Sequence, residues 1–318
     1  MGANGQLMPA PVLTPSSDVI AKAVAILRSG GLVAMPTETV YGLAADAANP
    51  EAVAAIYRVK ERPVFNPLIA HLAFPEAAFE QGHFSPAAKA LANAFWPGPL
   101  TLVVNAVPAT TVCDLARAGL DTLALRVPAH PVARDLLGAF GGPLVAPSAN
   151  PSGRISPTRA EHVATDMGEL VDLILDGGPC QEGLESTVVD ARGDAPVLLR
   201  QGTITPGRIA SVWPGLTEGG QDGRPVSPGQ LLRHYAPDAT LRLNADKAAP
   251  NEALLGFGAV DATLNLSPSG DLAEAAANLF AMLRDLDRSY DRIAVSPIPP
   301  EGLGAAINDR LARAANRS

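Results

Sequence analysis

Short apolar runs alternate with helical segments through the first two thirds of the chain, and this alternation limits the folds that are open to it. Strands are predicted at the runs LVAM, PLIAHLA, LTLVVNA, LALRVPA, PLVAP and VDLILD, which begin at residues 32, 67, 100, 123, 143 and 171. Helices are predicted near 86–95, 131–140, 158–167 and 205–211. This alternation is typical of an α/β sheet whose faces are covered by helices.

Two further strands, STVVDA and PVLLR, follow each other between residues 186 and 200 with no helix between them. Strands joined by a short connection pair antiparallel, because a parallel pair needs a long crossover. We therefore expect a mixed sheet rather than an all-parallel one.

Capping residues mark two helices near the N-terminus. Ser16 or Ser17 can cap a helix that runs to about residue 28. Asn49 can cap a second helix, which must end before Pro63 because a proline disfavours helix in the residue before it. The segment PTETVYGLAAD between them, residues 36–46, is predicted to be irregular.

Length and composition predict two domains. A single core usually stops growing beyond about 250 to 300 residues, and this chain has 318. Glycine and proline are frequent in residues 213–230, which marks a linker. We expect a first domain over 14–212 and a small α/β, Rossmann-like domain over 231–318. The core of the second domain would be thin, so we expect it to dock on the first.

Charge and cysteine content exclude several classes of protein. The formal net charge of -8 provides no large positive field for the bulk capture of nucleic acid. Cys113 and Cys180 have no disulfide or zinc spacing, and the five histidines never fall three to five residues apart. The uncharged run at 95–113 contains three prolines, which favours a buried strand over a membrane span. We expect a cytoplasmic protein without a protein-held metal.

The stretch RVKERPVFNPLI, residues 58–69, gathers Arg58, Lys60 and Arg62 in an acidic chain. Cations in the last turn of a helix complement the negative end of its dipole, and this effect alone can explain them. The other explanation is an anion clamp, because Lys60 and Arg62 lie two apart after the helix and would project to the same side. With the amide of Asn66 they would suit a phosphate, whose charge is spread over several oxygens.

Polar residues also follow two predicted strands. Ser148 and Asn150 come directly after the strand PLVA, and hydroxyl residues that include Thr39 come after LVAM. Segments of this composition are usually plain turns. Ligands of open α/β sheets, however, bind outside the carboxyl ends of the strands. We therefore weigh a binding site at this edge of the sheet against a turn.

Arg126 interrupts the apolar strand LALRVPA. A buried guanidinium needs a carboxylate or phosphate partner, and either an internal Asp or Glu or a ligand can supply it. Signatures of other enzyme classes are missing from the sequence. It contains no P-loop, no G-x-S-x-G and no complete dinucleotide-binding G-x-G-x-x-G.

Several motifs taken together resemble the threonylcarbamoyl-AMP synthase family, which has a YrdC-like domain. They are PTETVYGL, K-x-R-P followed by NPLI and His71, LRVP, PSAN-x-SG, and ESTVVD with the later Arg200. The similarity covers roughly residues 16–212, and HYAPDAT after SPGQ resembles the second-domain entry of the longer members. One departure is the pair Ala146 and Pro147, where many relatives carry a hydroxyl residue.

The resemblance implies that L-threonine, bicarbonate and ATP give L-threonylcarbamoyl-AMP and pyrophosphate. The product would feed the threonylcarbamoyl-adenosine modification of tRNA through a separate transferase, so any contact with tRNA would be indirect. Mg²⁺ would be carried mainly by the ATP phosphates, as is common for this ion. No membrane partner is implied.

The family's site residues carry over by motif. Threonine binding is assigned to Thr39, His71, Arg126, Ala146 and Ser186. ATP binding is assigned to Lys60, Arg62, Asn66, Thr122, Ser148, Asn150, Ser156, Arg200, His234 and Tyr235. Within that second set, the expected catalytic residues are Lys60, Arg62, Ser148 and Asn150.

Two other functions stay open at this level. A non-catalytic RNA-binding module can use the same basic hollow, because an anion pocket alone does not distinguish a nucleotide from an RNA phosphate. A related carbamoyl-transfer enzyme can act on another acceptor. Residues 1–212 contain 14 Lys or Arg against 19 Asp or Glu, which favours an enzyme over an RNA-binding module.

Overall fold

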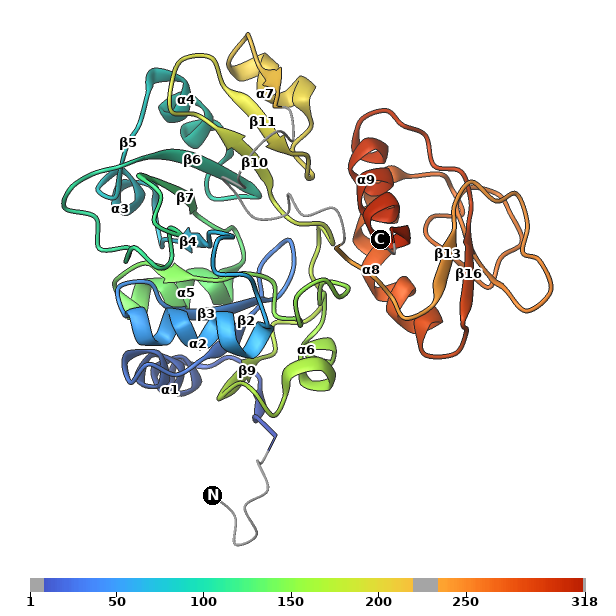
Figure 1. The fold of residues 1–318 in the computed structure, drawn as a ribbon, viewed down its shortest axis with the longest axis horizontal. Coiled ribbons are helices and arrows are strands. Elements are labelled where there is room, and N and C mark those ends of the chain that lie inside the picture. The colour runs from blue at the N-terminus through green and yellow to red at the C-terminus, as the bar shows by residue number, and fades with distance from the viewer. Residues whose placement is uncertain (1–8, 220–233, 317–318) are drawn as a thin grey trace, which may run out of the picture.

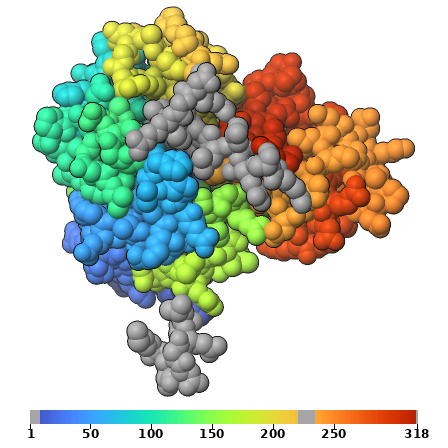
Figure 2. Space-filling model, in the orientation of Figure 1, coloured from blue at the N-terminus to red at the C-terminus, as the bar shows by residue number. Residues whose placement is uncertain are grey.

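The computed structural model describes residues 9–219 and 234–316, which form two bodies side by side (Figure 1). The N-terminal body, residues 9–219, is built on a large mixed sheet, and the C-terminal body, residues 234–316, on a small parallel sheet. In the space-filling view the C-terminal body stands as a lobe beside the N-terminal one (Figure 2). The predicted α/β class with a smaller second α/β unit is confirmed.

Twelve strands make up the large sheet. Their order is β1-β9-β2-β3-β8-β4-β7-β6-β10-β11-β12, with β5 paired to β6. Strands β10 and β11 are antiparallel, as expected, whereas β4 and β7 are parallel. The bounds are β1 Val12–Leu13, β2 Val33–Met35, β3 Gly42–Asp46, β4 Ile69–His71, β5 Gly82–His83, β6 Leu100–Ala106, β7 Thr122–Arg126, β8 Leu144–Val145, β9 Leu173–Leu175, β10 Thr187–Asp190, β11 Val197–Arg200 and β12 Thr217–Glu218.

Seven helices lie within residues 9–219, and five of them begin with proline. Proline suits this position because its fixed φ is already helical and a first-turn N–H would have no helical partner. The bounds are α1 Ser17–Arg28, α2 Pro50–Lys60, α3 Pro75–Phe79, α4 Pro86–Phe95, α5 Pro131–Phe140, α6 Ala160–Met167 and α7 Pro206–Val212.

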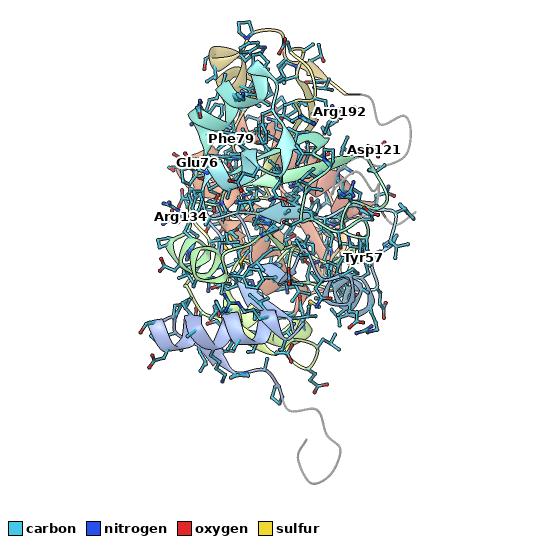
Figure 3. All side chains as sticks on the ribbon, turned by 90° about the vertical axis from the view of Figure 1, so that its left-hand side faces the viewer. Tyr57, Glu76, Phe79, Asp121, Arg134 and Arg192 are labelled. Atoms are coloured by element: carbon cyan, nitrogen blue, oxygen red, sulfur yellow. The ribbon has the colours of Figure 1, made fainter. Side chains whose placement is uncertain are left out.

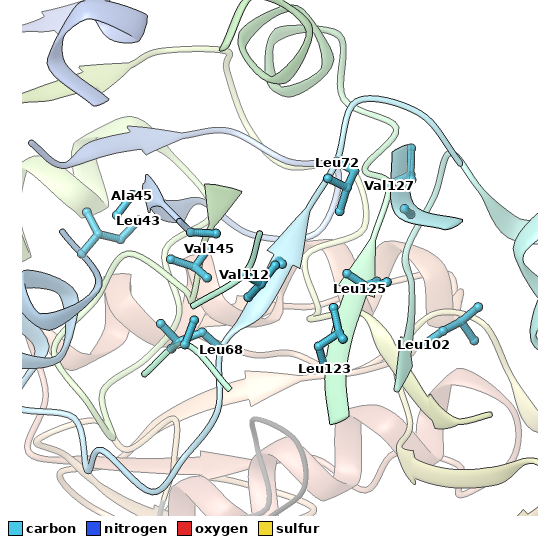
Figure 4. Packing of buried hydrophobic residues seen from close by; sticks show 14 of the residues in the cluster. Leu43, Ala45, Leu68, Leu72, Leu102, Val112, Leu123, Leu125, Val127 and Val145 are labelled. Carbon is cyan, nitrogen blue, oxygen red and sulfur yellow. The ribbon is translucent and has the colours of Figure 1, made fainter. Parts of the chain in front are cut away.

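Alternation along β3 separates the two faces of the large sheet. Leu43 and Ala45 belong to the cluster that includes α2, whereas Ala44 packs with α1 and α5. Successive side chains of a strand point to opposite faces, so the helices cover both sides. Figure 3 shows the helix of Arg134 (α5) and the helix of Tyr57 (α2) on the two sides of the strands. Figure 4 shows the α2-side cluster continuing across β8, β4 and β7.

The C-terminal body has an all-parallel sheet in the order β13-β16-β14-β15. Helix α8 packs on β14 and β16, and helix α9 packs on β13 and α8. This parallel α/β arrangement agrees with the predicted Rossmann-like unit. The bounds are β13 Thr240–Arg242, β14 Ala253–Gly256, β15 Leu264–Asn265, α8 Leu272–Asp287, β16 Arg292–Val295 and α9 Leu303–Ala315.

The two bodies share an apolar core. Val40, Ile155 and Leu184 of the N-terminal body pack in one buried cluster with Tyr235 and Phe280. Removing such side chains from water contributes on the order of 25 cal/mol per Å². The expectation that the second unit docks on the first is confirmed.

Three sequence expectations need correction. The segment 36–46 is not wholly irregular, because its second half forms β3, which pairs with β2 on one side and β8 on the other. Helix α3 and the short strands β1, β5, β12 and β15 were not predicted. Residues 213–219 of the expected linker belong to the N-terminal body, since β12 pairs with β11. Residues 220–230 of that linker lie outside the described residues.

No helix in residues 9–219 or 234–316 is long and apolar enough to cross a membrane. The uncharged run at 95–113 forms β6 with turns on either side, as its prolines predicted.

Candidate functional site

Nine of the fifteen predicted site residues line one cavity of about 50 Å³ on a face of the large sheet. Ile69 and His71 alternate on β4 and so point to the same face, and Arg126 is the register partner of His71 on β7. The opposite face carries Ala70 and Leu125 of the main core. The cavity is lined by Thr39, Val40, Arg62, Ile69, His71, Arg126, Ala146, Pro147, Ser148, Glu185, Ser186, Arg200 and His234.

The cavity is bordered by the carboxyl ends of β2 and β8, because both strands run antiparallel to β3 and the residues that follow them, Thr39 and Ser148, line it. Strand β8 runs antiparallel to β3 and β4, so its carboxyl end lies beside the beginning of β4. The backbone N–H of Ala146 accordingly donates to the Ile69 carbonyl at 3.1 Å. The residues after β8 continue beside the beginning of β3, where Ser148 bridges to Gly42 and the Leu43 N–H donates to the Pro147 carbonyl at 2.7 Å. Strand direction is not readable from the apolar run PLVAP itself.

Two of the larger hollows are weaker candidates. One of about 300 Å³ lies between the bodies, but its arginines Arg154 and Arg284 already form ion pairs with Asp238 and Asp166. Another of about 820 Å³ is a surface depression around residues 106–121 that includes no predicted site residue. The small cavity has room for only one or two waters at about 30 Å³ each. It must therefore widen to admit an amino acid and a nucleotide.

Lys60 is held by backbone carbonyls rather than by a carboxylate. Its side chain is only 2% exposed, and its ammonium donates to the Ser148 carbonyl at 2.5 Å and to the Asn150 carbonyl. Burial, followed by repulsion from Arg62, lowers the pKa of Lys60 well below its ordinary value. Lys60 thus fixes the segment 148–150 beside the cavity and does not itself line it.

Arg62 and Arg200 line the cavity as buried cations. Arg62 donates to the Asn66 carbonyl at 3.3 Å and to the Pro67 carbonyl at 3.1 Å. Arg200 donates to the Ser186 carbonyl at 3.0 and 3.1 Å and to its hydroxyl at 3.1 Å. Burial lowers the pKa of Arg62 to about 10, and nearby Arg200 acts in the same direction. Buried like charges that destabilise each other favour an anionic ligand between them.

Arg126 has an internal carboxylate partner, which is one of the two possibilities that the sequence left open. Its Nη2 donates to Glu38 Oε1 at 2.6 Å, and both side chains are buried. The other Glu38 oxygen accepts the N–H of Ala129 at 3.1 Å. Arg126 also lines the cavity, so a carboxylate in that space can approach it as a second partner.

Thr39 presents a hydroxyl whose hydrogen-bonding role is set by its neighbour. The Thr37 hydroxyl donates to the Val40 carbonyl at 2.6 Å, and its oxygen lies 2.8 Å from the Thr39 hydroxyl. Because the Thr37 proton is used, Thr39 must donate to Thr37. The Thr39 oxygen that lines the cavity is left to accept a hydrogen bond from a ligand hydroxyl or ammonium.

Glu185 joins the cavity wall to the C-terminal body. One of its oxygens accepts the Ser156 hydroxyl at 2.6 Å, and the other accepts Arg310 Nε at 3.1 Å. Burial raises the pKa of Glu185, but Arg310 and then Arg200 outweigh this effect, so the pKa lies below its ordinary value. The carboxylate therefore stays ionised although it is buried.

Two neutral imidazoles face the cavity. Burial, followed by nearby Arg126, lowers the pKa of His71 to about 3, and its Nδ1 donates to the Ile69 carbonyl at 3.1 Å. Burial also lowers the pKa of His234 to about 3, with Arg62 and Arg200 adding to the effect against the opposing charge of Glu185. Neither histidine adds positive charge to the cavity near neutral pH.

The depressed pKa of His71 predicts a loss of stability on acidification. The unfolded chain takes up a proton below about pH 6.5, which the folded chain resists until about pH 3, so unfolding is favoured as pH falls through this window. The contribution is at most about 1.4 kcal/mol per pH unit. In urea titrations between about pH 7 and pH 5, His71→Gln should flatten the decline in the free energy of unfolding. The exposed His83, changed to Gln, is the control; equal slopes for the two variants would contradict the prediction.

The other predicted site residues lie around the cavity, with one exception. Lys60 and Asn150 meet at the 148–150 segment, Ser156 bonds to Glu185, and Asn66 bonds to Arg62 through its carbonyl. Tyr235 is buried next to His234, with ring centroids 4.0 Å apart. Thr122 is not brought to the cavity, because it begins β7 and lies four residues, about 13 Å, before Arg126.

Sequence reasoning missed Glu38, Glu185 and Arg310 as parts of the site. Glu185 was visible in the motif ESTVVD and Glu38 in PTETVYG, but nothing local connects either to an arginine. Among the described residues, no group of three or more His, Cys, Asp or Glu side chains is placed to hold a metal ion. The described cysteines Cys113 and Cys180 are both free.

The fold and the cavity thus define an α/β protein with a small cavity lined by buried arginines and hydroxyl groups. Family models agree with this class and make it specific. Residues 25–202 match the model described as telomere recombination, which covers the Sua5, YciO and YrdC proteins. Residues 204–316 match the model of the threonylcarbamoyl-AMP synthase C-terminal domain.

Curated relatives match over almost the whole chain. The threonylcarbamoyl-AMP synthase of Bacillus subtilis is 39% identical over 95% of this chain and 94% of its own. That of Pyrococcus abyssi is 38% identical over 92% of both chains. The chain belongs to the threonylcarbamoyl-AMP synthase family.

Solved structures of one relative share the fold over both bodies. The P. abyssi Sua5 protein in complex with L-threonine superposes with a TM-score of 0.87 at 36% identity, covering 98% of each chain. A variant of that protein, with a histidine and a tyrosine replaced by alanine, gives a TM-score of 0.86 at 34% identity and covers 96% of each chain. The two-body architecture is therefore that of the longer family members.

Proposed function

We propose that this chain is an L-threonylcarbamoyladenylate synthase, which converts L-threonine, bicarbonate and ATP into L-threonylcarbamoyl-AMP and pyrophosphate. The observation that carries the proposal is the single cavity in which buried Arg62, Arg126 and Arg200 meet hydroxyl groups, in a chain of this family. The carboxylate of an amino acid and the triphosphate of a nucleotide are both anionic groups. Buried cations that face one space suit both of them together.

Threonine would lie at the end of the cavity that holds Arg126. Its carboxylate would take the free side of the Arg126 guanidinium, whose other side is fixed by Glu38. The hydroxyl or amine of the substrate threonine would donate to the Thr39 oxygen, because the Thr39 hydroxyl already donates its proton to Thr37. His71, Ala146 and Ser186 would complete this end.

The nucleotide would lie along the other cations. Arg62 and Arg200 would neutralise phosphate oxygens, and Lys60 would hold the segment with Ser148 and Asn150 in place. Asn66, Ser156, His234 and Tyr235 border this region, and Thr122, the remaining predicted ATP contact, does not line the cavity. Mg²⁺ would arrive with the ATP phosphates, because the described residues offer no carboxylate cluster for it.

The reaction depends mainly on positioning the two substrates and on neutralising the charge of the phosphates. The threonine amine and bicarbonate form a carbamate with loss of water, and a carbamate oxygen then attacks the ATP α-phosphorus. The bond from the α-phosphorus to the bridging oxygen breaks, and pyrophosphate leaves. Fixed cations in a site without bulk water stabilise the charge that develops on the phosphates. The closed cavity would also protect the carbamate and the mixed anhydride from water.

The biological setting follows from the product. A separate tRNA threonylcarbamoyl transferase would consume it, so contact with tRNA would be indirect, and the work would take place in the cytoplasm without a membrane partner. The catalytic domain would correspond to the N-terminal body and extend beyond the expected 14–212 to include β12, and the C-terminal domain would correspond to the expected 231–318.

Omission of single substrates tests the proposal. Pyrophosphate release by the purified full chain should require ATP, L-threonine and bicarbonate together. The pocket should also reject valine or serine, because an unpaired buried polar group costs about 1 to 3 kcal/mol. Pyrophosphate release without threonine, or equal turnover with another acceptor, would indicate a related carbamoyl-transfer enzyme instead.

An RNA-binding role has less support from the geometry. The side chains of Lys60, Arg62, Arg126 and Arg200 are each at most 9% exposed, so they cannot reach an RNA backbone while the cavity is closed. RNA binding that weakens steeply with salt, in a chain that releases no pyrophosphate, would favour that alternative.

A further inference from the structure

Arg310, on helix α9 of the C-terminal body, is the largest fully buried side chain in the described residues, with 1% exposure. Its Nε donates to Glu185 of the N-terminal body at 3.1 Å, and its Nη1 donates to the adjacent Asp309 at 2.9 Å. Its guanidinium carbon lies 5.5 Å from the ring centroid of Tyr235. Arg310 therefore contacts both bodies and is hydrogen-bonded to Glu185, which lines the cavity.

We propose that Arg310 is a positioning residue of the active site, which acts through Glu185 to hold the Ser156 hydroxyl at the nucleotide side of the cavity. This inference rests on the proposed synthase function and adds a residue from outside the catalytic domain to the site. Arg310 does not line the cavity, and its effect passes through the carboxylate that does.

The first part of the argument concerns geometry. One carboxylate oxygen of Glu185 accepts a hydrogen bond from Arg310 at 3.1 Å, and the other accepts one from Ser156 at 2.6 Å. The Ser156 hydroxyl donates to Glu185, so its proton is used and only its oxygen is left to accept a hydrogen bond. The orientation of Ser156 is therefore fixed by a carboxylate that is itself fixed by Arg310.

The second part concerns charge. Without Arg310, the buried Glu185 carboxylate would lose its hydrogen-bonded cation. A buried carboxylate without a cation is destabilised, so Glu185 would move or take up a proton, and its hydrogen bond with Ser156 would change. Because Ser156 belongs to the proposed nucleotide side of the cavity, the loss should appear on the ATP side of the reaction.

Contacts of Arg284 show a second way in which the C-terminal body holds the segment 155–156. Arg284 on α8 donates to the backbone carbonyl of Ile155 and forms an ion pair with Asp166 at 2.6 Å. The segment 155–156 is thus held by the C-terminal body at its backbone through Arg284 and at its side chain through Arg310 and Glu185.

Kinetics of Arg310→Met test the proposal, because methionine keeps the apolar stem and removes the cation. We expect the KM for ATP to rise about 10-fold or more and the KM for threonine to change less than about 3-fold. A residue that only docks the two bodies would lower the folded fraction, and so the apparent kcat, without this split. An unchanged KM for ATP would therefore overturn the proposal.

A second substitution checks that the effect passes through Glu185. In Glu185→Gln combined with Arg310→Met, the amide oxygen still accepts the Ser156 hydroxyl and needs no counterion. We expect the double variant to recover the KM for ATP to within about 5-fold of the parent, so that the two changes are strongly non-additive. Effects that simply multiply would contradict the network.

Asp238→Asn is the matched control. It removes another ion pair between the bodies, with Arg154, whose two side chains are 48% and 78% exposed. An exposed pair contributes little, so we expect less than about a 2-fold change in either KM. If Arg310→Met does not fold, Arg310→Lys replaces it. Lysine keeps the charge but cannot bond Glu185 and Asp309 as a fork, so a rise of about 3-fold in the KM for ATP is expected and no rise overturns the proposal.

Direct binding separates this inference from the function itself. If the parent chain releases no pyrophosphate, the proposed function fails, and the binding of a non-hydrolysable ATP analogue can still be measured by calorimetry. Weaker binding by Arg310→Met than by the parent, with Asp238→Asn unchanged, would then support the network. Equal binding by all three would overturn it.

Discussion

Replacing Arg62 with alanine is expected to lower threonine-dependent pyrophosphate release about 100- to 1000-fold while the protein stays folded. Arg62 lines the cavity, and its contacts within the described residues go to the carbonyls of Asn66 and Pro67. It has no carboxylate among these contacts, so its removal leaves no buried anion unpaired there. The lost charge would otherwise neutralise the triphosphate as pyrophosphate leaves.

Arg58→Ala is the control for Arg62→Ala. Both arginines come from the same short stretch, but Arg58 is exposed on α2 and Arg62 is buried. Thermal unfolding and initial rates of pyrophosphate release should show two folded proteins, of which only the Arg58 variant is active. Turnover near that of the parent in both Arg62→Ala and Lys60→Ala would reject the anion clamp.

The elements that the sequence predicted best are those whose ends are chemically marked. Ser16 accepts the N–H of Val19 and Asn49 accepts that of Glu51, as capping residues at these positions should. Lys60 and Arg62 are both buried, but not through the extended chain that would place side chains two apart on one side. Lys60 ends α2, and the exposed Glu61 between them adopts a left-handed conformation, with φ of 51°.

The local sequence could not predict which carboxylates pair with the buried arginines. Glu38 and Arg126 are 88 positions apart in the chain, and Glu185 and Arg310 are 125 apart. The sequence required only that Arg126 find some carboxylate or phosphate, and it left an internal partner and a ligand equally open. Which residues meet depends on how the strands are ordered, and an apolar run does not encode its neighbours.

The direction of the strands was the other feature that the sequence could not predict. The run PLVAP predicted a strand, and β8 is one, but only the completed sheet shows that it lies antiparallel between β3 and β4. That direction places Ser148 beside Gly42, at the edge where β3 and β4 begin. It also gives β2 and β8 a common carboxyl edge, so Thr39 and Ser148 line one cavity.

Replacing Arg126 with methionine is expected to have the largest combined effect on stability and activity. Glu38 would be left as a buried carboxylate with only the Ala129 N–H as a partner, which typically costs about 3 to 5 kcal/mol. The proposed site for the threonine carboxylate would also be lost, so the KM for threonine should rise about 100-fold or more. Urea denaturation and initial rates at varied threonine measure the two effects. Arg192→Met, which breaks an exposed pair with Asp190, should cost less than about 1 kcal/mol.

Adding Glu38→Gln to Arg126→Met separates the two roles of this arginine. The double variant has no unpaired buried charge, so most of the lost stability should return, because a neutral replacement of a buried ion pair is often well tolerated. Threonine affinity should not return, since the guanidinium that would bind its carboxylate is still missing. Recovery of stability alone would show that Arg126 serves both the fold and the substrate. Recovery of both would mean that Arg126 acts on threonine only by keeping Glu38 neutralised, and threonine would then be held by the hydroxyl groups of the cavity instead.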